Sequence, residues 1–212
     1  MLIAAASATS ALAASDVASS GVESLIATLA RPAPAQIAFT EVRFSSLLKA
    51  PLIVSGELAY TGPASLDRRV LEPYREETTI RGDSVRVARE GAPTRTFALR
   101  RAPELRGLLS SFAALLAGDA QTIEREFETS LAGAGDAWAL TLTPRDARAR
   151  KRLKQIVIDG AADTPRCFTL LNADGGASVM LLGDAAGAEP PAAATNSLTL
   201  ESLRKTCAGA GA

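Results

Sequence analysis

The chain contains no histidine, and aromatic residues make up only 4% of its 212 residues. Without imidazole, neither a Ser-His or Cys-His nucleophile system nor a histidine-ligated metal site can form. Walker-type phosphate loops and the GxGxxG and GxSxG motifs are also missing. We therefore expect a protein that is not an enzyme and that needs no cofactor or metal.

Acidic side chains come close together in two places, at Glu76 and Glu77 and at Glu124, Glu126 and Glu128. Catalysis by paired carboxylates requires two such groups to flank a substrate at a set separation. Neighbouring or alternating acids on a surface strand or helix are more typical of a solvated face. We favour that interpretation for both groups.

Neither sign of charge is in excess, because 23 Lys and Arg residues balance 23 Asp and Glu residues. This balance argues against a nucleic-acid partner bound through counterion release. One local basic run stands out between two predicted strands, and it comprises Arg145, Arg148, Arg150, Lys151, Arg152 and Lys154. It is either a solvated connector or, through Arg148, Arg150, Lys151 and Arg152, a docking patch for an acidic partner or anionic lipid.

The first 14 residues are apolar and alanine-rich, and Ala11-Leu12-Ala13 has the small-residue pattern of a signal-peptide cleavage site. The basic n-region is missing, so a disordered Ala/Ser arm is the alternative. We predict that the protein is exported, with a signal peptide over residues 1–14 and one mature domain over 15–212. Ser15 stands where a bacterial lipoprotein has cysteine, and no later run of about 18 apolar residues follows. A soluble protein without a lipid anchor is therefore expected.

Only two cysteines are present, Cys167 and Cys207, and they lack CxxC spacing. In an oxidising compartment an even number of cysteines favours one disulfide. Such a bond would contribute about 4 kcal/mol in the chain-entropy model. Two buried free thiols are the alternative.

Short runs with apolar residues at every second position, interrupted by Gly and Pro, predict antiparallel strands in the first half. A helix around Val22–Leu29 precedes them and ends at Pro32 and Pro34. The predicted strands are Ile37–Leu48 with a bulge between Phe39 and Val42, Val54–Tyr60, Arg68–Leu71, Arg75–Arg81, Ser84–Arg89 and Thr94–Leu99.

A leucine stripe at helical spacing predicts a helix over Leu105–Leu116, beginning near Pro103 and ending at Gly118. Asp119 can cap a further turn that extends through Glu126. The remaining predicted strands are Trp138–Thr143, Leu153–Asp159, Cys167–Asn172 and Ala177–Leu182. A Pro/Ala-rich linker at 185–194 precedes a terminal segment around Leu200, which could be helix or strand.

The predicted fold class is α+β, with a strongly curved antiparallel sheet and helices laid on one side. Straight helices do not fit flush against a curved sheet, so its concave side either fills with large side chains or keeps a pocket. Because aromatic residues are few and alanine is abundant, the sequence favours a cavity.

Several motifs occur in a characteristic order. Phe39 and Phe44 precede Ser55-Gly56-Glu57-Leu58, which is followed by Tyr60, by Pro63 and Pro73 ten residues apart, and by Asp83 before a valine-rich strand. Leu115 to Asp119, Phe127, and Trp138 to Pro144 follow later. In this order the motifs resemble those of the LolA-like family of periplasmic lipoprotein carriers, in a divergent branch, from about Asp16 to Leu182.

The resemblance implies an unclosed β-barrel of the LolA/LolB type with a helical lid. Its apolar interior would shelter the acyl chains of a lipoprotein or another envelope lipid, such as a glycolipid. The cargo would pass from an inner-membrane exporter to an outer-membrane acceptor, carried by a monomer. A lipid-sensing module of the same fold that regulates a partner protein is the alternative, and an enzyme acting on a lipid head group would need polar residues at the pocket mouth.

Typical carriers have an arginine immediately before the first of the two prolines, where it latches the lid, but Gly62 occupies that position here. Arg68 and Arg69 are the nearby candidates for a latch. The residues expected to form the cavity wall are Phe39, Phe44, Leu58, Tyr60, Leu108, Phe112, Leu115, Trp138 and Leu140. For the helical stripe over Leu105–Leu116, ordinary core packing is the alternative to a ligand wall.

Overall fold

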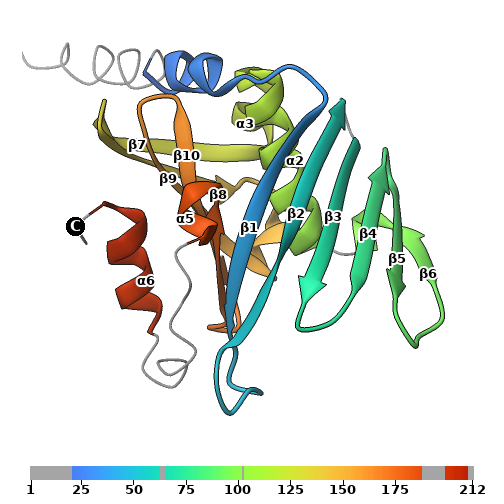
Figure 1. Cartoon of the computed structure of the whole chain (residues 1–212). Helices are drawn as coiled ribbons and strands as arrows, with labels where there is room; N and C mark the ends of the chain where they lie inside the picture. The colour runs from blue at the N-terminus through green and yellow to red at the C-terminus, as the bar shows by residue number, and fades with distance from the viewer. Residues whose placement is uncertain (1–20, 63–64, 102, 188–198, 210–212) are drawn as a thin grey trace, which may run out of the picture.

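The computed structural model describes residues 21–62, 65–101, 103–187 and 199–209. Eleven strands in these ranges form one curved antiparallel sheet with the order β6-β5-β4-β3-β2-β1-β11-β10-β9-β8-β7 (Figure 1). Within these ranges β6 and β7 are the two edges of the sheet and do not pair, so the sheet forms an unclosed barrel. The predicted fold class is confirmed.

Two meanders meet at the first strand, which pairs with β2 on one side and with β11 on the other. The first meander consists of β1 (Ala35–Phe44), β2 (Leu52–Gly62), β3 (Ser65–Glu72), β4 (Glu76–Arg81), β5 (Ser84–Arg89) and β6 (Arg95–Ala98). The second consists of β7 (Phe127–Ala134), β8 (Ala137–Pro144), β9 (Leu153–Ala161), β10 (Thr164–Asn172) and β11 (Ala177–Leu182).

Helices connect and cover these meanders. Residues 21–29 form the first helix. The other helices in the described ranges are η1 (Leu99–Arg101), α2 (Pro103–Ala117), α3 (Ala120–Glu126), α4 (Ala147–Arg150), α5 (Asp184–Gly187) and α6 (Leu200–Cys207). Gly118 ends α2 with a φ of 68°, a left-handed conformation that glycine adopts without a Cβ penalty. Asp119 caps α3 by accepting the Thr122 N–H at 2.9 Å, as the sequence predicts.

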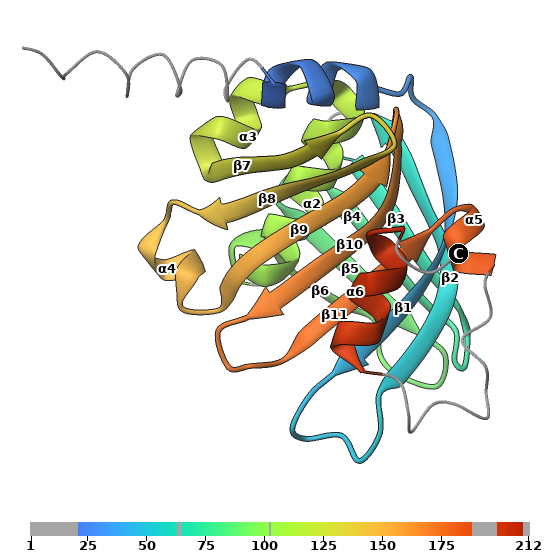
Figure 2. The same cartoon turned by 90° about the vertical axis from the view of Figure 1, so that its left-hand side faces the viewer.

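Apolar side chains form separate clusters on the two faces of the sheet. The inner cluster joins the concave face to helix 21–29, α2 and α3. The outer cluster joins Val42, Val179 and Leu181 to Leu203 of α6. Figure 2 shows α6 in front of β10 and β11, while α2 lies behind the sheet. The expectation that the helices lie on one side is therefore wrong, because α5 and α6 cover the opposite face.

The strand that begins at Ala35 also differs from its prediction. Its pairing with both neighbours runs without a register shift, so the expected bulge between Phe39 and Val42 is absent from this described strand. The strand ends at Phe44 rather than Leu48, and Leu47 in the following turn is 92% exposed. The alternation of buried and exposed side chains is lost in this strand because both faces of the sheet are covered there. On the outer face, for example, the Thr40 hydroxyl donates to the Ala186 carbonyl of α5 at 2.9 Å.

A disulfide between Cys167 and Cys207 fastens α6 to the outer face of β10, with a Cα–Cα distance of 5.6 Å. The predicted bond is confirmed, and the terminal segment that could be helix or strand is a helix. Its N-terminus carries a capping box in which Thr199 and Ser202 bond each other's backbone. The predicted signal peptide and residues 188–198, which include most of the predicted linker, lie outside the described residues.

Candidate functional site

Seven of the predicted wall residues come together in the inner cluster. They are Phe39, Leu58, Tyr60, Phe112, Leu115, Trp138 and Leu140, and all are buried. Phe44 packs instead against the outer cluster, because it lies an odd number of positions from Phe39 along β1. For Leu108 the structure describes the helical backbone only.

Side chains of the inner cluster fill much of the barrel interior, but an apolar cavity remains near the C-terminal end of α2. Its volume is about 290 Å³, at the lower end of the range of roughly 300–1,000 Å³ for ligand pockets. Its lining comes from helix 21–29 and the segment after it, from α2, and from β1, β2, β10 and β11. It comprises Leu29, Arg31, Ala35, Gln36, Ile37, Leu58, Tyr60, Phe112, Leu116, Thr164, Pro165 and Leu182. Three of the residues predicted to form the cavity wall, Leu58, Tyr60 and Phe112, therefore line this cavity.

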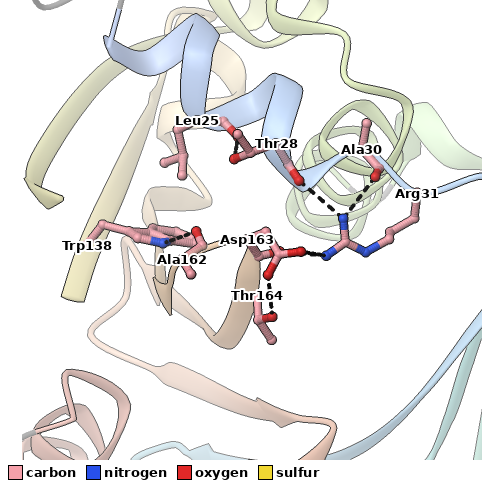
Figure 3. A network of polar contacts seen from close by, with 8 residues as sticks. All are labelled: Leu25, Thr28, Ala30, Arg31, Trp138, Ala162, Asp163 and Thr164. Carbon is pink, nitrogen blue, oxygen red and sulfur yellow. Dashed lines mark hydrogen bonds and ion pairs between the residues drawn. The ribbon is translucent and has the colours of Figure 1, made fainter. Parts of the chain in front are cut away.

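Arg31 ties together the elements that surround this cavity (Figure 3). Its side chain donates to the carbonyl of Asp163 at 2.7 Å and to the Asp163 carboxylate at 3.0 Å, in the turn between β9 and β10. Its backbone N–H donates to the Leu116 carbonyl at the end of α2, at 2.8 Å. We call these contacts the Arg31 clasp. The hydroxyl of Thr164, followed by the charge of Arg31, lowers the pKa of Asp163.

The turn that holds Asp163 is fixed from the other side by Trp138. Its indole Nε1 donates to the Ala162 carbonyl at 3.0 Å, as Figure 3 shows. Gly160 makes room for the ring, because a Cβ at that position would overlap the indole. The β9–β10 turn is therefore held rigidly, whereas Arg31 and Asp163 remain 37% and 62% exposed.

A charged group is buried further along the inner face. Glu41 of β1 is 6% exposed and Arg68 of β3 is 7% exposed. The Arg68 Nη2 donates a hydrogen bond to the Glu41 Oε2 at 2.6 Å. Arg43 donates two hydrogen bonds of 2.8 Å to the same carboxylate, and the Ser178 hydroxyl donates another. Burial raises the pKa of Glu41, but the Arg43 hydrogen bonds, the charges of Arg43 and Arg68 and the Ser178 hydroxyl bring it down to about 2.

The two latch candidates make their polar contacts with the sheet. Arg68 pairs with Glu41, lies 4.8 Å from the Phe39 ring centre, and comes within 3.8 Å of Glu76. Arg69 is half exposed and pairs with Glu57 and Glu77. In the described part of the chain, neither arginine has a polar partner on α2, and the helices are joined to the sheet by Arg31 instead.

Sequence reasoning missed Arg31, Asp163 and Glu41. The first two lie in turns, where no periodic pattern indicates which side chains will meet. Glu41 left a signal, since it is the charged residue within the stretch of β1 where the alternation weakens.

The predicted docking residues lie at the turn between β8 and β9, around α4 (Figure 2). Arg148, Arg150, Lys151 and Arg152 are all exposed. Asp146 caps α4 by accepting the N–H groups of Arg148 and Ala149 at 3.0 and 2.8 Å.

The acidic residues singled out in the sequence have polar partners in the described structure. Glu76 and Glu77 lie near Arg68 and Arg69, and Glu126 accepts a hydrogen bond from the Ser110 hydroxyl at 2.9 Å.

Helices of the described segments are too short or too polar for one to traverse a bilayer.

The fold is therefore an unclosed barrel with an apolar cavity that is covered by helices. A family model described as outer membrane lipoprotein carrier protein LolA-like matches residues 13–210. The chain therefore belongs to the LolA-like family, as its motifs suggest.

Solved structures of similar shape are distant in sequence. A LolA superfamily protein from Nitrosomonas europaea has 11% identity over 79% of this chain and 92% of that chain, with a TM-score of 0.45. A putative outer membrane lipoprotein-sorting protein domain from Vibrio parahaemolyticus has 7% identity over 86% and 97%, with a TM-score of 0.42. LprF from Mycobacterium bovis has 12% identity over 80% and 94%, with a TM-score of 0.38. No curated protein matches the sequence.

Proposed function

We propose that this protein is a periplasmic carrier that shelters the acyl chains of a lipoprotein or other envelope lipid and passes them from the inner to the outer membrane. The observation that carries the proposal is the apolar cavity of about 290 Å³ between helix 21–29, α2 and the sheet. Each methylene moved from water into such a cavity gains about 0.8 kcal/mol. An acyl chain therefore has a thermodynamic reason to enter it.

A complete acyl chain needs more room than the closed cavity offers, so the helices that cover it must move. The Arg31 clasp is suited to this, because its ion pair is exposed and exposed pairs contribute little to stability. The other contacts of helix 21–29 are apolar, made by Val22, Ile26 and Leu29. Such contacts can be exchanged for contacts with an acyl chain at little cost. Binding would then replace side-chain packing by lipid packing.

The proposal is tested by purifying the protein from the periplasm, extracting it and weighing what is bound. We expect acyl-chain lipid in a stoichiometric amount, and transfer of that lipid between donor and acceptor vesicles. Lipid that stays on the protein in the vesicle assay would favour the lipid-sensing alternative, and a change in lipid mass would favour an enzyme. A protein that extracts and binds no lipid would contradict the proposal.

Replacing Arg31 with methionine is expected to accelerate lipid uptake and release by about two- to five-fold, because the exposed ion pair is lost while the backbone bond to Leu116 remains. Stopped-flow transfer of a fluorescent fatty acid measures both rates. Arg81→Met is the matched control, since it removes a similarly exposed pair with Asp67 on β3 and β4. Equal rates in both variants and the wild type would remove the clasp from the gating step.

A further inference from the structure

A second hollow, of about 500 Å³, lies near the N-terminal half of α2 and is different in character. Its walls come from η1, α2, α3, β7, β8, α4 and β9. The residues that line it are Arg100, Arg106, Gly107, Arg125, Glu126, Phe127, Pro144, Arg145, Asp146, Arg148, Ala149 and Leu153. We call this hollow the arginine pocket.

Five arginines and two carboxylates line the arginine pocket, in a chain whose overall charge is zero. Of the five, only Arg100 has an ion pair within the described residues, to Asp83 at 2.9 Å. The two carboxylates are held by uncharged donors: Ser110 donates to Glu126, and backbone N–H groups donate to Asp146. The lining therefore carries three more positive than negative charges, or two more when Asp83 is counted.

One of these arginines is held in place for binding. Arg145 donates through Nε to the carbonyls of Glu124 and Phe127, at 2.9 and 3.0 Å. These bonds fix the guanidinium while its two terminal nitrogens make no hydrogen bond to any described residue. A fixed guanidinium fork loses little entropy when it binds a phosphate through two hydrogen bonds.

The floor of the arginine pocket is apolar and consists of side chains that pack against the barrel interior. Phe127 and Leu153 belong to the inner cluster and are 3% and 1% exposed. Gly107 allows α2 to approach this floor closely, since a Cβ there would lie 2.8 Å from the Leu153 side chain. An acyl chain attached to a group held by the arginines would therefore meet Phe127 and Leu153 first, and it would reach the core when α2 moves away from them. The hollow lacks exposed aromatic faces for base stacking, which disfavours single-stranded nucleic acid.

From this arrangement we infer that the arginine pocket binds a phosphate group. Resting on the proposed function, we assign that phosphate to the head group of the carried amphiphile. The head would lie at the N-terminal half of α2 while the acyl chain extends beneath the helix toward the apolar cavity at its other end. Arg106 and Leu116, which mark the two hollows, are ten residues apart, or about 15 Å along a helix. The positive end of the α2 dipole adds to the attraction for the anion.

The test measures binding of glycerol 3-phosphate by calorimetry to the full mature chain. The variant Arg106→Gln/Arg148→Gln removes two pocket arginines whose side chains make no hydrogen bond or ion pair with a described residue, and we expect at least a ten-fold loss of affinity. The matched control is Arg150→Gln/Arg152→Gln, which removes two charges from the neighbouring exposed turn but not from the pocket. We expect less than a two-fold change in the control. Equal losses in both variants, or no binding by the wild type, would overturn the inference.

Vesicle assays distinguish a lipid head group from free phosphate. Wild-type protein should extract phosphatidic acid in preference to phosphatidylcholine, and the pocket variant should lose this preference. Binding of glycerol 3-phosphate without any preference among lipids would overturn the assignment to the cargo.

An uncharged long-chain alcohol separates this inference from the proposed function. The pocket variant should still bind the alcohol, because the apolar cavity is unchanged. If the wild type and both variants all fail to bind the alcohol, the result would count against the carrier function, whatever is found for glycerol 3-phosphate.

Discussion

Replacement of Glu41 by glutamine is expected to lower the free energy of unfolding by about 3–5 kcal/mol, because it leaves the buried Arg68 without its closest counter-charge. The nearest remaining carboxylate, that of Glu76, is 3.8 Å from Arg68. For a chain of this size, such a loss lowers Tm by roughly 10 °C. Denaturant and thermal unfolding, followed by circular dichroism, measure both quantities.

Two further variants show whether the loss comes from an unpaired buried charge. Asp67→Asn breaks the exposed pair with Arg81 on the same sheet and should cost less than about 1 kcal/mol. Glu41→Leu combined with Arg68→Met removes both charges and should recover much of the stability lost in Glu41→Gln. If the double variant is no more stable than Glu41→Gln, the penalty comes from packing rather than from charge.

The same carboxylate makes acid stability depend on pH in a defined window. Its pKa is about 2 in the folded protein, against 4.5 for an unperturbed Glu. Since the folded pKa is the lower one, the contribution is fully present above pH 4.5 and is lost as the pH falls from 4.5 toward 2. A shift of this size corresponds to about 3 kcal/mol. Glu41→Gln should lack this part of the acid profile, and an unchanged profile would contradict the assignment.

The parts of the fold that the sequence predicts well are those with one covered face. The strands β2, β3 and β4 bury alternate side chains, so a period of two is visible in the sequence. The outer face of β1 lies beneath α5, and the contacting residues Thr40 and Ala186 are 146 positions apart in the sequence. No local sequence pattern can indicate that α5 covers this face. The weakened alternation near Glu41 therefore suggested a bulge, although it marks a strand buried on both sides.

The candidate site shows a similar limit. The leucine stripe predicts α2 and its apolar face, but which residues line a cavity depends on how the helix sits on the sheet. Phe112 and Leu116 face the cavity, whereas Leu115 belongs to the filled part of the inner cluster. The basic run was visible in the sequence, yet the arginine pocket also needs Arg100, Arg106 and Arg125 from other elements. Only folding brings those charges together.

A tryptophan in place of Ala35 is expected to reduce acyl-chain binding by at least ten-fold. Ala35 begins β1 opposite Tyr60, is half-buried and lines the apolar cavity. An indole at this position would occupy the space proposed for the lipid tail, as core residues fill space in any packed interior. Because Ala35 is only half-buried and is followed by the exposed Gln36, the ring can be accommodated with only a small change in unfolding free energy. Displacement of a fluorescent fatty acid measures the binding, and thermal unfolding checks the fold.

Ala38→Trp is the control that makes the result specific. Ala38 belongs to the same strand three positions later, so its side chain points to the opposite face of the sheet, where it is exposed. It should bind the fatty acid as the wild type does. Equal loss in both variants would mean that tryptophan disturbs the strand, and unchanged binding in Ala35→Trp would place the acyl chain outside this cavity. Because the cavity is the one apolar space on which the carrier proposal rests, the second outcome would remove its structural basis.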